Sequence, residues 1–526
     1  TAPAGSPEDR AGPGAGAVAG LVSAAAALAI SAVVHTLIPS IPFPPVAVAE
    51  AVIRGAPGSV DAFFIDNLQH GARPAAVIGS GLGLVIAGTL LGLLLPAVRR
   101  WLGGRTLLAA ALLAVPLYLV AVLTYRPASG DVGRFLYAAA LIPILGASVW
   151  FGTQAFRRVA VGRVTRDTDV TRREVVRAMW IGGAAFLVGW ANLGRLVFRR
   201  PDPGNNRLAA GGNVSPAPQP SAAPGDASFA GVAGLSPQIT PNGRFYTVNE
   251  EIFPPDVDPT TWRLEIGGLV DRPISVSYRE LTSMPAIEQY MTLECISNQT
   301  GGHLISNARW TGVPLRDLLH RAGVKPGAIE VVSTSVDGYA DSVPVADAMS
   351  PHTIIAYGMN GNQLPRAHGF PARILVPGYY GMKQPKWLGT IQLVDQPFNG
   401  YWEQRGWIKE AVVRTMSRID TPKNHSSVDG SVVVAGIAFA GDRGISRVEV
   451  STDAGHAFAD ADLRTPLSEF TWRQWKYRFT PKPGADTTIV VRATDGTGAT
   501  QTSAVRPPEY SGSTGWHGVE VVDQSG

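Results

Sequence analysis

The sequence predicts a multi-domain protein with an N-terminal all-α membrane bundle, a central region of mixed strands and short helices, and a C-terminal β-sandwich. Three features of its 526 residues support this expectation. Apolar runs long enough to cross a membrane fill the first 200 residues, a stretch rich in Pro, Gly, Ala and Ser follows, and short apolar runs alternate with turns beyond it. A chain of this length ordinarily holds two or three domains.

Five apolar runs approach or exceed the roughly 20 residues that a helix needs to cross a hydrocarbon core. They are Ala15–Leu37, Pro74–Val98, Thr106–Thr124, Val132–Phe156 and Val175–Phe198. The segment between the first two runs is amphipathic and broken by Pro and Gly, which favours an interfacial or re-entrant element over a further span. We expect a tail at residues 1–14 and a transmembrane domain of about five helices at residues 15–200.

The arginines predict an orientation, because short cytoplasmic loops carry an excess of Lys and Arg. Three arginines lie at 99–105 and seven at 157–177, whereas the alternate loops at 39–71 and 125–131 are poor in basic residues. With five spans, both arginine-rich loops share one side. We therefore expect a multi-pass protein of the cytoplasmic (inner) membrane, with its N-terminus inside and everything after the fifth span outside. This clustering, with a net charge of only +4, does not suggest a nucleic-acid partner.

A second signal precedes the fifth run. Thr171, Arg172 and Arg173 begin the stretch "TRREVVRAMWIGGAAFLVGWANL", which resembles a twin-arginine export signal. That route exports proteins already folded around a cofactor. The alternative is that Arg172 and Arg173 are ordinary orientation charges on the cytoplasmic side.

Beyond the membrane region, residues 201–238 have the composition of a linker. The stretch "VPLRDLLHRAGV" then places Leu315, Leu318 and Leu319 on one helical face. Residues 408–526 contain apolar stretches such as "SVVVAGIAFA" and "TTIVVRATDG" between Gly/Asp turns, which predicts a β-sandwich of about 100 residues.

Cys295 is the only cysteine, so the chain cannot form an internal disulfide. It follows "YMTLE", which reads as a strand, and precedes "ISNQTGG", a polar and glycine-rich turn. A cysteine at the end of a strand can present its sulfur to a ligand. The alternative is a small buried apolar residue, which is the usual role of a lone cysteine.

Three further stretches favour a ligand role for Cys295 over that of a buried apolar residue. They are "FYTVNEEIFPPDVDPTTWRLEIGGLVDRP" from Phe245, "HGFPAR…PGYYGMKQPKW" within 364–395, and "GYWEQRGW" ending at Trp407. With the cysteine segment they resemble, in order and spacing, the sulfite oxidase family of molybdenum enzymes. The resemblance implies a sulfite-oxidase-like α+β molybdopterin domain at 239–407. It also implies an immunoglobulin-like dimerisation domain at 408–526, and hence a homodimer.

The resemblance implies one molybdopterin cofactor, with the Cys295 thiolate as the protein ligand to molybdenum. A soft thiolate suits this metal. The other cofactor-binding residues that it implies are Tyr246, Thr247, Asn249, Asp337, His368, Arg373, Gln384, Pro385 and Lys386. The basic residues suit the pterin phosphate. Taken singly, each basic residue has the alternative of a surface charge, and His368 that of a buried structural histidine.

The chain departs from sulfite oxidases at positions that bind the anion. Val248, Gln299 and Thr300 stand where those enzymes carry arginines. Each hydrogen bond lost from a charged group costs about 1.5–3 kcal/mol, so sulfite should bind weakly. A less charged substrate, such as an S-oxide or N-oxide, fits at least as well. Tyr379 and Tyr380 could line its pocket, although such aromatic residues are more often core.

Trp407 aligns with the active-site tyrosine of the family. Arg309 and Lys383 remain as candidate cations beside the metal. The expected catalytic residues are therefore Cys295, Trp407, Arg309 and Lys383.

The chain lacks a haem attachment motif and iron–sulfur cysteines, and only His35 of its nine histidines lies in a span. We therefore expect no haem or iron–sulfur cluster within it, and electron exchange with a separate carrier: a cytochrome, a quinone or a membrane partner subunit. The membrane part would be an anchor, a docking surface or a quinone site. The leading expectation is a membrane-anchored molybdenum oxidoreductase that performs oxygen-atom or proton-coupled electron transfer on a small extracytoplasmic substrate. The alternatives are a sulfite dehydrogenase with an altered anion pocket and a non-catalytic scaffold subunit.

Overall fold

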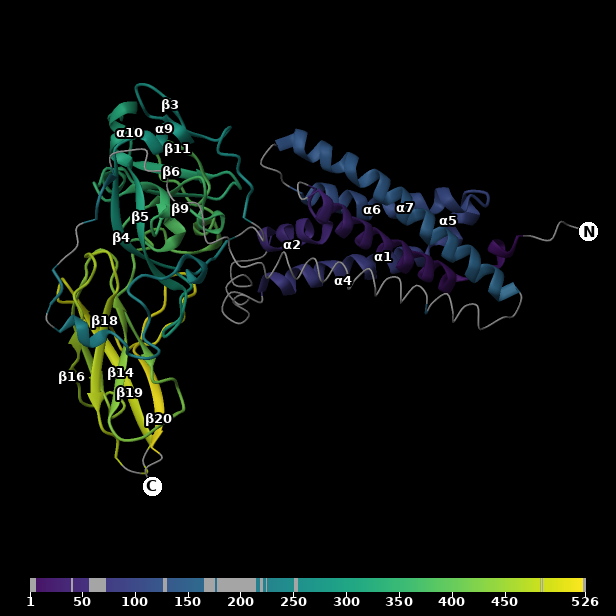
Figure 1. Ribbon diagram of the computed structural model, residues 1–526. Helices are drawn as coiled ribbons and strands as arrows, with labels where there is room; N and C mark the ends of the chain where they lie inside the picture. The colour runs from purple at the N-terminus through teal and green to yellow at the C-terminus, as the bar shows by residue number, and fades with distance from the viewer. Residues whose placement is uncertain are drawn as a thin grey trace, which may run out of the picture. The chain divides into compact units, whose positions relative to one another are not determined.

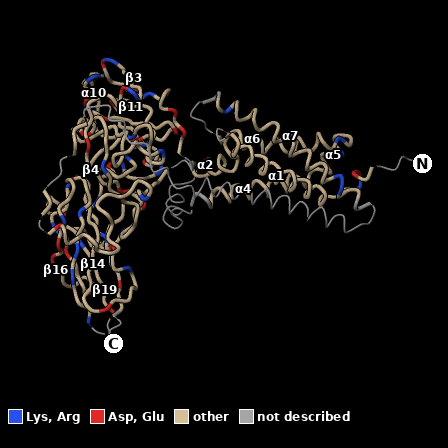
Figure 2. Tube along the Cα trace, in the orientation of Figure 1, with Lys and Arg blue, Asp and Glu red and all other residues tan. Residues whose placement is uncertain are grey.

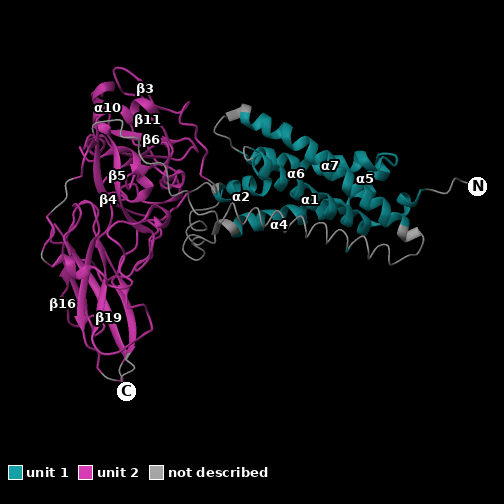
Figure 3. Cartoon of the chain, in the orientation of Figure 1, with its two compact units in different colours: residues 1–56, 67–200, 250–253 teal, residues 57–66, 201–249, 254–526 magenta. Residues whose placement is uncertain are grey.

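The chain forms two compact units, shown in different colours in Figure 3. The first comprises residues 1–56, 67–200 and 250–253, and the second comprises 57–66, 201–249 and 254–526. The computed structural model describes residues 6–38, 41–55, 72–125, 130–164, 176, 214–217, 221–223, 225–249, 254–482, 484 and 486–523. The fifth predicted span, the twin-arginine stretch and much of the predicted linker lie outside these ranges.

The first unit is a bundle of apolar helices (Figure 1). Its elements are η1 (Pro7–Arg10), α1 (Pro13–Leu37), α2 (Pro44–Gly55), α4 (Ala72–Leu93), α5 (Leu95–Trp101), α6 (Thr106–Thr124) and α7 (Gly130–Val164). Among the described residues, four helical stretches are long and apolar enough to cross a membrane. They are Pro13–Leu37, Ala75–Leu93, Thr106–Thr124 and Gly133–Val161. Four predicted spans thus coincide with apolar helices, and Figure 2 shows few charged residues along them.

Glycines bring α1 and α4 into backbone contact. A Cβ atom added to Gly20 would lie 2.2 Å from the carbonyl oxygen of Gly88, and one added to Gly92 would lie 2.3 Å from that of Gly16. No side chain fits at these crossings. Small residues of this kind let membrane helices approach closely and gain van der Waals contact.

In the second unit, residues 214–394 build two sheets (Figure 1). One has the order β1-β4-β5-β8-β10, with β9 beside β8, and the other has the order β3-β2-β11-β6-β7. The strands are β1 (Val214–Ser215), β2 (Arg263–Gly268), β3 (Ile274–Ser277), β4 (Ala286–Glu294), β5 (Ile305–Pro314), β6 (Glu330–Ser335), β7 (Ala340–Pro344), β8 (Ile354–Met359), β9 (Asn362–Gln363), β10 (Arg373–Leu375) and β11 (Leu388–Val394).

Short helices cover these sheets: α9 (Tyr278–Ser283), α10 (Leu315–Ala322) and α11 (Val345–Ala348). In α10 the predicted apolar face is confirmed, because Leu315, Leu318 and Leu319 are all fully buried. They join an apolar core shared with strands of both sheets. The 3.6-residue period thus fixes how this helix packs.

The C-terminal residues form two further sheets around one apolar core. One has the order β12-β14-β18-β17 and the other the order β13-β20-β19-β15-β16. The strands are β12 (Met416–Thr421), β13 (Ser426–Val428), β14 (Val432–Phe439), β15 (Ile445–Ser451), β16 (Ala459–Asp460), β17 (Asp462–Leu463), β18 (Arg473–Phe479), β19 (Asp486–Asp495) and β20 (His517–Asp523). The β-rich character is as predicted, and the immunoglobulin-like topology stays a prediction.

Within the second unit, the C-terminal sheets are joined to the end of β4. The N–H of Thr292 donates to the carbonyl of Phe470 at 3.0 Å, and the N–H of Trp472 donates to the hydroxyl of Thr292 at 2.9 Å. An apolar cluster combines Ile296 and Ile305 with residues of the C-terminal sheets. The segment that carries Cys295 therefore lies at this junction.

Candidate active site

Cys295 lies at the end of a central strand. β4 ends at Glu294, which pairs with Ile305 of β5. The buried Cys295 follows, its N–H donating to the carbonyl of Leu304 at 2.9 Å and its carbonyl accepting from the N–H of Asn298 at 3.0 Å. The chain therefore turns directly after the cysteine, as the strand-then-turn pattern predicts.

The loop after the cysteine is held from two sides. The side-chain amide of Asn298 donates to Glu294 Oε1 at 2.9 Å. From the C-terminal part, Ser513 Oγ donates to the carbonyl of Asn298 at 2.6 Å, and Arg418 Nη1 donates to the carbonyl of Gly302 at 2.6 Å. These bonds fix the position of the loop relative to the strand.

Three ionisable side chains around the cysteine are protonated and neutral at pH 7. Burial raises the pKa of Glu294 to about 8. Burial, and then the negative charge of the Cys295 thiolate, raises the pKa of Tyr246 well above its usual value of 10. Burial also raises the pKa of Tyr380, and Glu294 adds to the effect. The cysteine is therefore accompanied by protonated side chains and not by carboxylates.

The turn η6 (Gly381–Lys383) passes against the same strand end. A Cβ atom added to Gly381 would lie 2.9 Å from Tyr246 Oη and 3.5 Å from the carbonyl oxygen of Glu294. Only glycine allows this approach. Residue 381 thus brings the "PGYYGMKQPKW" stretch up to the cysteine strand.

His368 is buried at the end of η5 (Arg366–His368), with 1% of its surface exposed. Its Nε2 lies 2.9 Å from the carbonyl oxygen of Asn242, so Nε2 carries the proton and donates. Burial lowers its pKa to about 3, and the nearby cations Lys386 and Arg373 add to this. His368 is therefore a neutral donor at neutral pH.

Arg373 begins β10 and is 5% exposed. Its Nη1 donates to the carbonyl of His368 at 3.1 Å and its Nη2 to that of Gln384 at 3.2 Å. Among the described residues, its Nε has no hydrogen-bond partner and no carboxylate pairs with it. Burial lowers its pKa to about 10. A buried cation without a counter-ion is costly, so this position suits an anionic ligand.

The predicted cofactor-binding stretches 246–249 and 384–386 lie together. Lys386 Nζ donates to the carbonyl of Val248 at 3.0 Å and to Oδ1 of Asn249. Gln384 is held by its side chain, which donates to the carbonyl of Tyr379 at 2.9 Å. The structure thus brings these stretches beside Arg373 and His368.

Trp407 lies in an apolar cluster with Ile296, the residue after the cysteine, and Tyr380. It is 4% exposed, and among the described residues its indole Nε1 has no hydrogen-bond partner. The rings of Trp402 and Tyr510 each lie 5.8 Å from its ring. The indole N–H is a buried donor that a ligand could satisfy.

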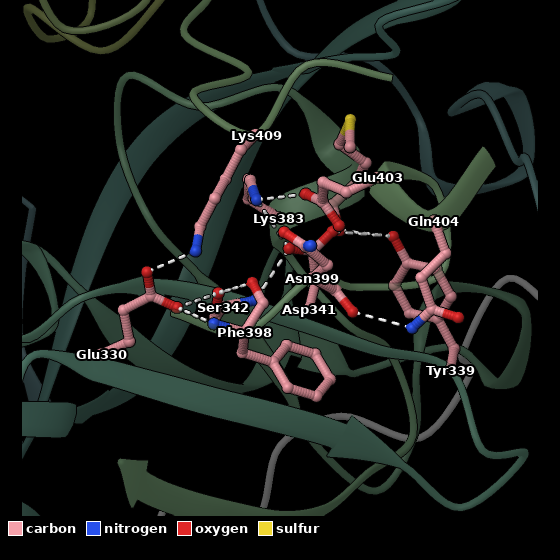
Figure 4. Close-up of polar contacts among 11 residues, drawn as sticks. Glu330, Tyr339, Asp341, Ser342, Lys383, Phe398, Asn399, Glu403, Gln404 and Lys409 are labelled. Carbon is pink, nitrogen blue, oxygen red and sulfur yellow. Dashed lines mark hydrogen bonds and ion pairs between the residues drawn. The ribbon is translucent and has the colours of Figure 1, made fainter. Parts of the chain in front are cut away.

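The structure places the two candidate cations elsewhere. Lys383 is buried between Asp341, at 2.7 Å, and Glu403 (Figure 4). Arg309 pairs with Tyr290 in the β4–β5 ladder and lies 3.5 Å from Glu288. That register puts Arg309 five residues along the strand from the cysteine, about 17 Å at roughly 3.4 Å per residue. Neither cation is brought together with the cysteine by the contacts described.

Asp337 lies in the turn between β6 and β7, where its Oδ1 accepts from the N–H of Tyr339 at 3.1 Å. No described contact joins Thr247 or Asp337 to Cys295. The buried carboxylates Asp341 and Glu403 were not among the site residues predicted from the sequence. Glu403 stood within the quoted "GYWEQRGW" stretch, and Asp341 interrupts an apolar strand, which was the available signal.

Comparison with known proteins gives the family. Residues 251–402 match the family described as "Oxidoreductase molybdopterin binding domain", and residues 405–521 match "Mo-co oxidoreductase dimerisation domain". The mitochondrial sulfite oxidase of Rattus norvegicus is 31% identical over 339 residues, which cover 54% of this chain and 61% of that protein. The sulfite oxidase of Gallus gallus is 31% identical over 333 residues, which cover 53% of this chain and 72% of that protein. The uncharacterized oxidoreductase YuiH of Bacillus subtilis (strain 168) is 32% identical over 176 residues, which cover 33% of this chain and 87% of that protein.

The chain thus spans about three fifths of the length of the rat enzyme. The matched regions contain the strand end with Cys295, the buried Arg373 and the C-terminal sheets. Both the family matches and the buried cation Arg373 agree with a molybdopterin cofactor. The chain belongs to the sulfite oxidase family of molybdopterin-dependent oxidoreductases.

Proposed function

We propose that this molybdopterin oxidoreductase is anchored in a membrane and reduces a small, weakly charged oxide, such as an S-oxide or N-oxide, outside the cytoplasm. Cys295 is the protein ligand to molybdenum in this proposal. The cofactor, when bound, supplies a metal that exchanges an oxygen atom and electrons with the substrate. A separate carrier, either a cytochrome, a quinone or a membrane partner subunit, delivers the electrons.

The main support for the cofactor assignment is the burial of Arg373 and its lack of an anionic partner among the described residues. Its guanidinium is buried, makes two bonds to backbone carbonyls, and has neither a carboxylate partner nor a partner for Nε among the described residues. A pterin phosphate would supply the missing anion and acceptor. The ammonium of Lys386 adds a further group suited to phosphate or pterin oxygens, whereas the single N–H of His368 already donates to the carbonyl of Asn242.

The proposed cofactor site is assembled from four stretches of chain. Tyr246, Thr247 and Asn249 come from the first, Cys295 from the second, Asp337 from the turn between β6 and β7, and the others from the stretch within 364–395. The residues proposed to hold the cofactor are Tyr246, Thr247, Asn249, Cys295, Asp337, His368, Arg373, Gln384, Pro385 and Lys386. The bonds from Lys386 to residues 248 and 249 support the union of the first and last stretches.

The proposed substrate class follows from the lack of a cationic side chain at positions 248, 299 and 300. Val248 offers a backbone carbonyl to Lys386, Gln299 is exposed, and Thr300 Oγ1 donates to the carbonyl of Thr514 at 3.2 Å. None of these three positions provides a cation for a dianion such as sulfite. A neutral oxide needs no such cations.

Trp407 suits the oxygen of such a substrate, because its buried indole N–H has no acceptor among the described residues. We assign it the role of donor to the substrate oxygen. In the proposed reduction the S–O or N–O bond breaks, and the substrate gains two electrons. Two protons and the oxygen form water. Burial keeps bulk water away from the donor and strengthens the bond.

The decisive experiment is molybdenum analysis of the purified full chain. Wild type should hold about one molybdenum per chain, and Cys295→Ala almost none. Ile296→Val, which trims one methyl group beside the cysteine, should keep wild-type content. Dye-driven turnover is then measured with S-oxides, N-oxides and sulfite. A folded wild type without molybdenum would contradict the catalytic assignment and favour the scaffold alternative.

Sulfite oxidation is the second candidate, because two relatives named above are sulfite oxidases. It would require an anion pocket built from other residues than the three lost arginine positions. The same assay separates the candidates. Turnover of sulfite with an acceptor dye, without reduction of any oxide, would support the second and reject the first.

For the membrane part, we propose a cytoplasmic N-terminus, a fifth span at 175–198, and the second unit outside the membrane. The four apolar helices support anchoring. Protease added to spheroplasts should cut within residues 201–238, and protection there would reverse the orientation. Changing Arg172 and Arg173 to Lys should block export if that pair is a twin-arginine signal. The match to a dimerisation domain supports a dimer.

A further inference from the structure

The segment that carries Trp407 is fastened by ion contacts on both sides. Four residues before the indole, Glu403 pairs with the buried ammonium of Lys383. Two residues after it, Lys409 Nζ lies 2.5 Å from Glu330 Oε1. Figure 4 shows both contacts in one view. Trp407 therefore sits between two charged anchors that are close to it in sequence.

The two anchors belong to one network on the neighbouring strands β6 and β7. Glu330 Oε2 accepts from Ser342 Oγ at 2.8 Å and from the N–H of Phe398 at 2.9 Å. The N–H of Ser342 donates to Asp341 Oδ1 at 2.7 Å, and Asp341 pairs with Lys383 at 2.7 Å. A continuous chain of polar contacts thus runs from one anchor to the other across the sheet (Figure 4).

The buried half of the network leaves no room for adjustment. The side chains of Lys383, Asp341 and Glu403 are 2%, 0% and 4% exposed. A Cβ atom added to Gly400 would lie 2.5 Å from Glu403 Oε2 and 3.0 Å from Asp341 Cγ. Buried ion pairs of this kind contribute little net stability because desolvation opposes them. Their geometry does join β7, η6 and η7 (Glu403–Arg405) in one arrangement.

The network also reaches the cysteine side. Lys383 ends η6, and Tyr339 Oη donates to the carbonyl of Met382 at 2.6 Å. The same turn brings Gly381 against Tyr246 and the carbonyl of Glu294. One lysine side chain therefore links the segment of Trp407 to the turn that touches the cysteine strand.

We propose that Asp341, Lys383 and Glu403, together with the Glu330–Lys409 pair, are positioning residues that hold the indole N–H of Trp407 toward the substrate. This inference rests on the proposed function, in which that N–H binds the substrate oxygen. Backbone hydrogen bonds hold the segment locally: the N–H of Trp407 donates to the carbonyl of Trp402 at 3.1 Å, and the N–H of Ile408 donates to the carbonyl of Tyr510 at 2.8 Å. The polar network adds side-chain contacts at η7 (Glu403–Arg405) and at Lys409, on either side of the indole.

The test compares Glu403→Gln, Asp341→Asn and Lys383→Met with the matched control Glu449→Gln in the full chain. Glu449 is likewise buried and ion-paired, with Arg492 at 2.9 Å, but it lies on β15. In the three variants kcat should fall on the order of tenfold to a hundredfold relative to the control, with KM little changed.

A second readout needs no turnover. The emission of Trp407 is isolated as the difference between each protein and its Trp407→Phe counterpart. It should shift to longer wavelength in the three variants and not in the control. If Glu403→Gln fails to fold, Lys409→Met on the more exposed side serves instead. Variants that match the control in emission and kcat would overturn the inference. An inactive wild type whose Trp407 emission still responds would overturn only the proposed function.

Discussion

Replacing Arg373 by Met should separate cofactor binding from the stability of the fold. Arg373 is the buried cation whose Nε lacks a partner among the described residues, and Met keeps much of its volume without its charge. Arg366→Met is the matched control, because Arg366 also donates to two backbone carbonyls, those of Pro254 and Pro255, both at 2.9 Å. Unlike Arg373, it is 45% exposed.

The expected change in the unfolding free energy follows from the burial of Arg373. The pKa of Arg373 falls from 12.5 to about 10. At about 1.4 kcal/mol per pH unit, keeping the guanidinium charged in the fold costs about 3 kcal/mol. The cost is fully present at pH 7, because both folded and unfolded chains are protonated there. Met removes it but also removes two bonds from a charged donor, worth about 1.5–3 kcal/mol each. The unfolding free energy of the cofactor-free protein should therefore stay the same or fall by up to about 3 kcal/mol.

The loaded protein should show the change in cofactor retention. One charged bond to a phosphate is worth about 1.5–3 kcal/mol, so Arg373→Met should weaken cofactor retention about ten- to a hundredfold. Molybdenum per chain after dialysis and the melting temperature are measured, with and without cofactor synthesis in the host. Molybdenum retention equal to that of Arg366→Met would refute the assignment of Arg373 to the phosphate.

Three further outcomes follow from the geometry. Gly381→Ala places a methyl group 2.9 Å from Tyr246 Oη, so molybdenum content should fall several-fold in elemental analysis. Burial lowers the pKa of His517 to about 4, below its value near 6.5 in the unfolded chain. Between those values the unfolded chain binds more protons than the folded chain, so the unfolding free energy should fall by up to about 1.4 kcal/mol for each unit by which the pH decreases. This dependence of the unfolding free energy on pH should be weaker in His517→Asn. Burial would raise the pKa of Asp495, but hydrogen bonds that include one from Arg443 hold it at about 2. That stabilisation is present above pH 3.8 and lost as pH falls through 2, so Asp495→Asn should cost about 2 kcal/mol at pH 7, measured by denaturant unfolding.

Local patterns were enough to predict the helices and strands. The apolar runs of the membrane part coincide with four helices because length and hydropathy are properties of contiguous sequence. The three leucines of α10 are buried as their spacing predicts. The strand before Cys295 and the turn after it are likewise local features. The cofactor-binding residues came from family resemblance and stay predictions about binding.

Contacts between distant segments were not predictable in the same way. The ammonium of Lys383 looked like a candidate catalytic cation, and its carboxylate partners lie 42 residues before it and 20 after it. The packing of Tyr510 against Trp407 joins residues from different parts of the second unit. Such pairings depend on sheet order and loop paths, which a period-based reading of one sequence does not give.

The distribution of charge connects the fold to the proposed substrate. Arg373 is buried within the stretches proposed to hold the cofactor. In that proposal the cofactor phosphate matches its charge, which is then not offered to a substrate. Lys383 is matched by two carboxylates in the same way. Near the cysteine, Glu294 and Tyr246 are protonated, and among the described residues the neutral indole N–H groups of Trp407 and Trp472 have no acceptor. In the proposed site the cations are paired with the cofactor or with carboxylates of the fold, and a neutral oxide can still be oriented by one hydrogen bond. A dianion would find no unpaired cation there, so the cost of removing its water would not be compensated.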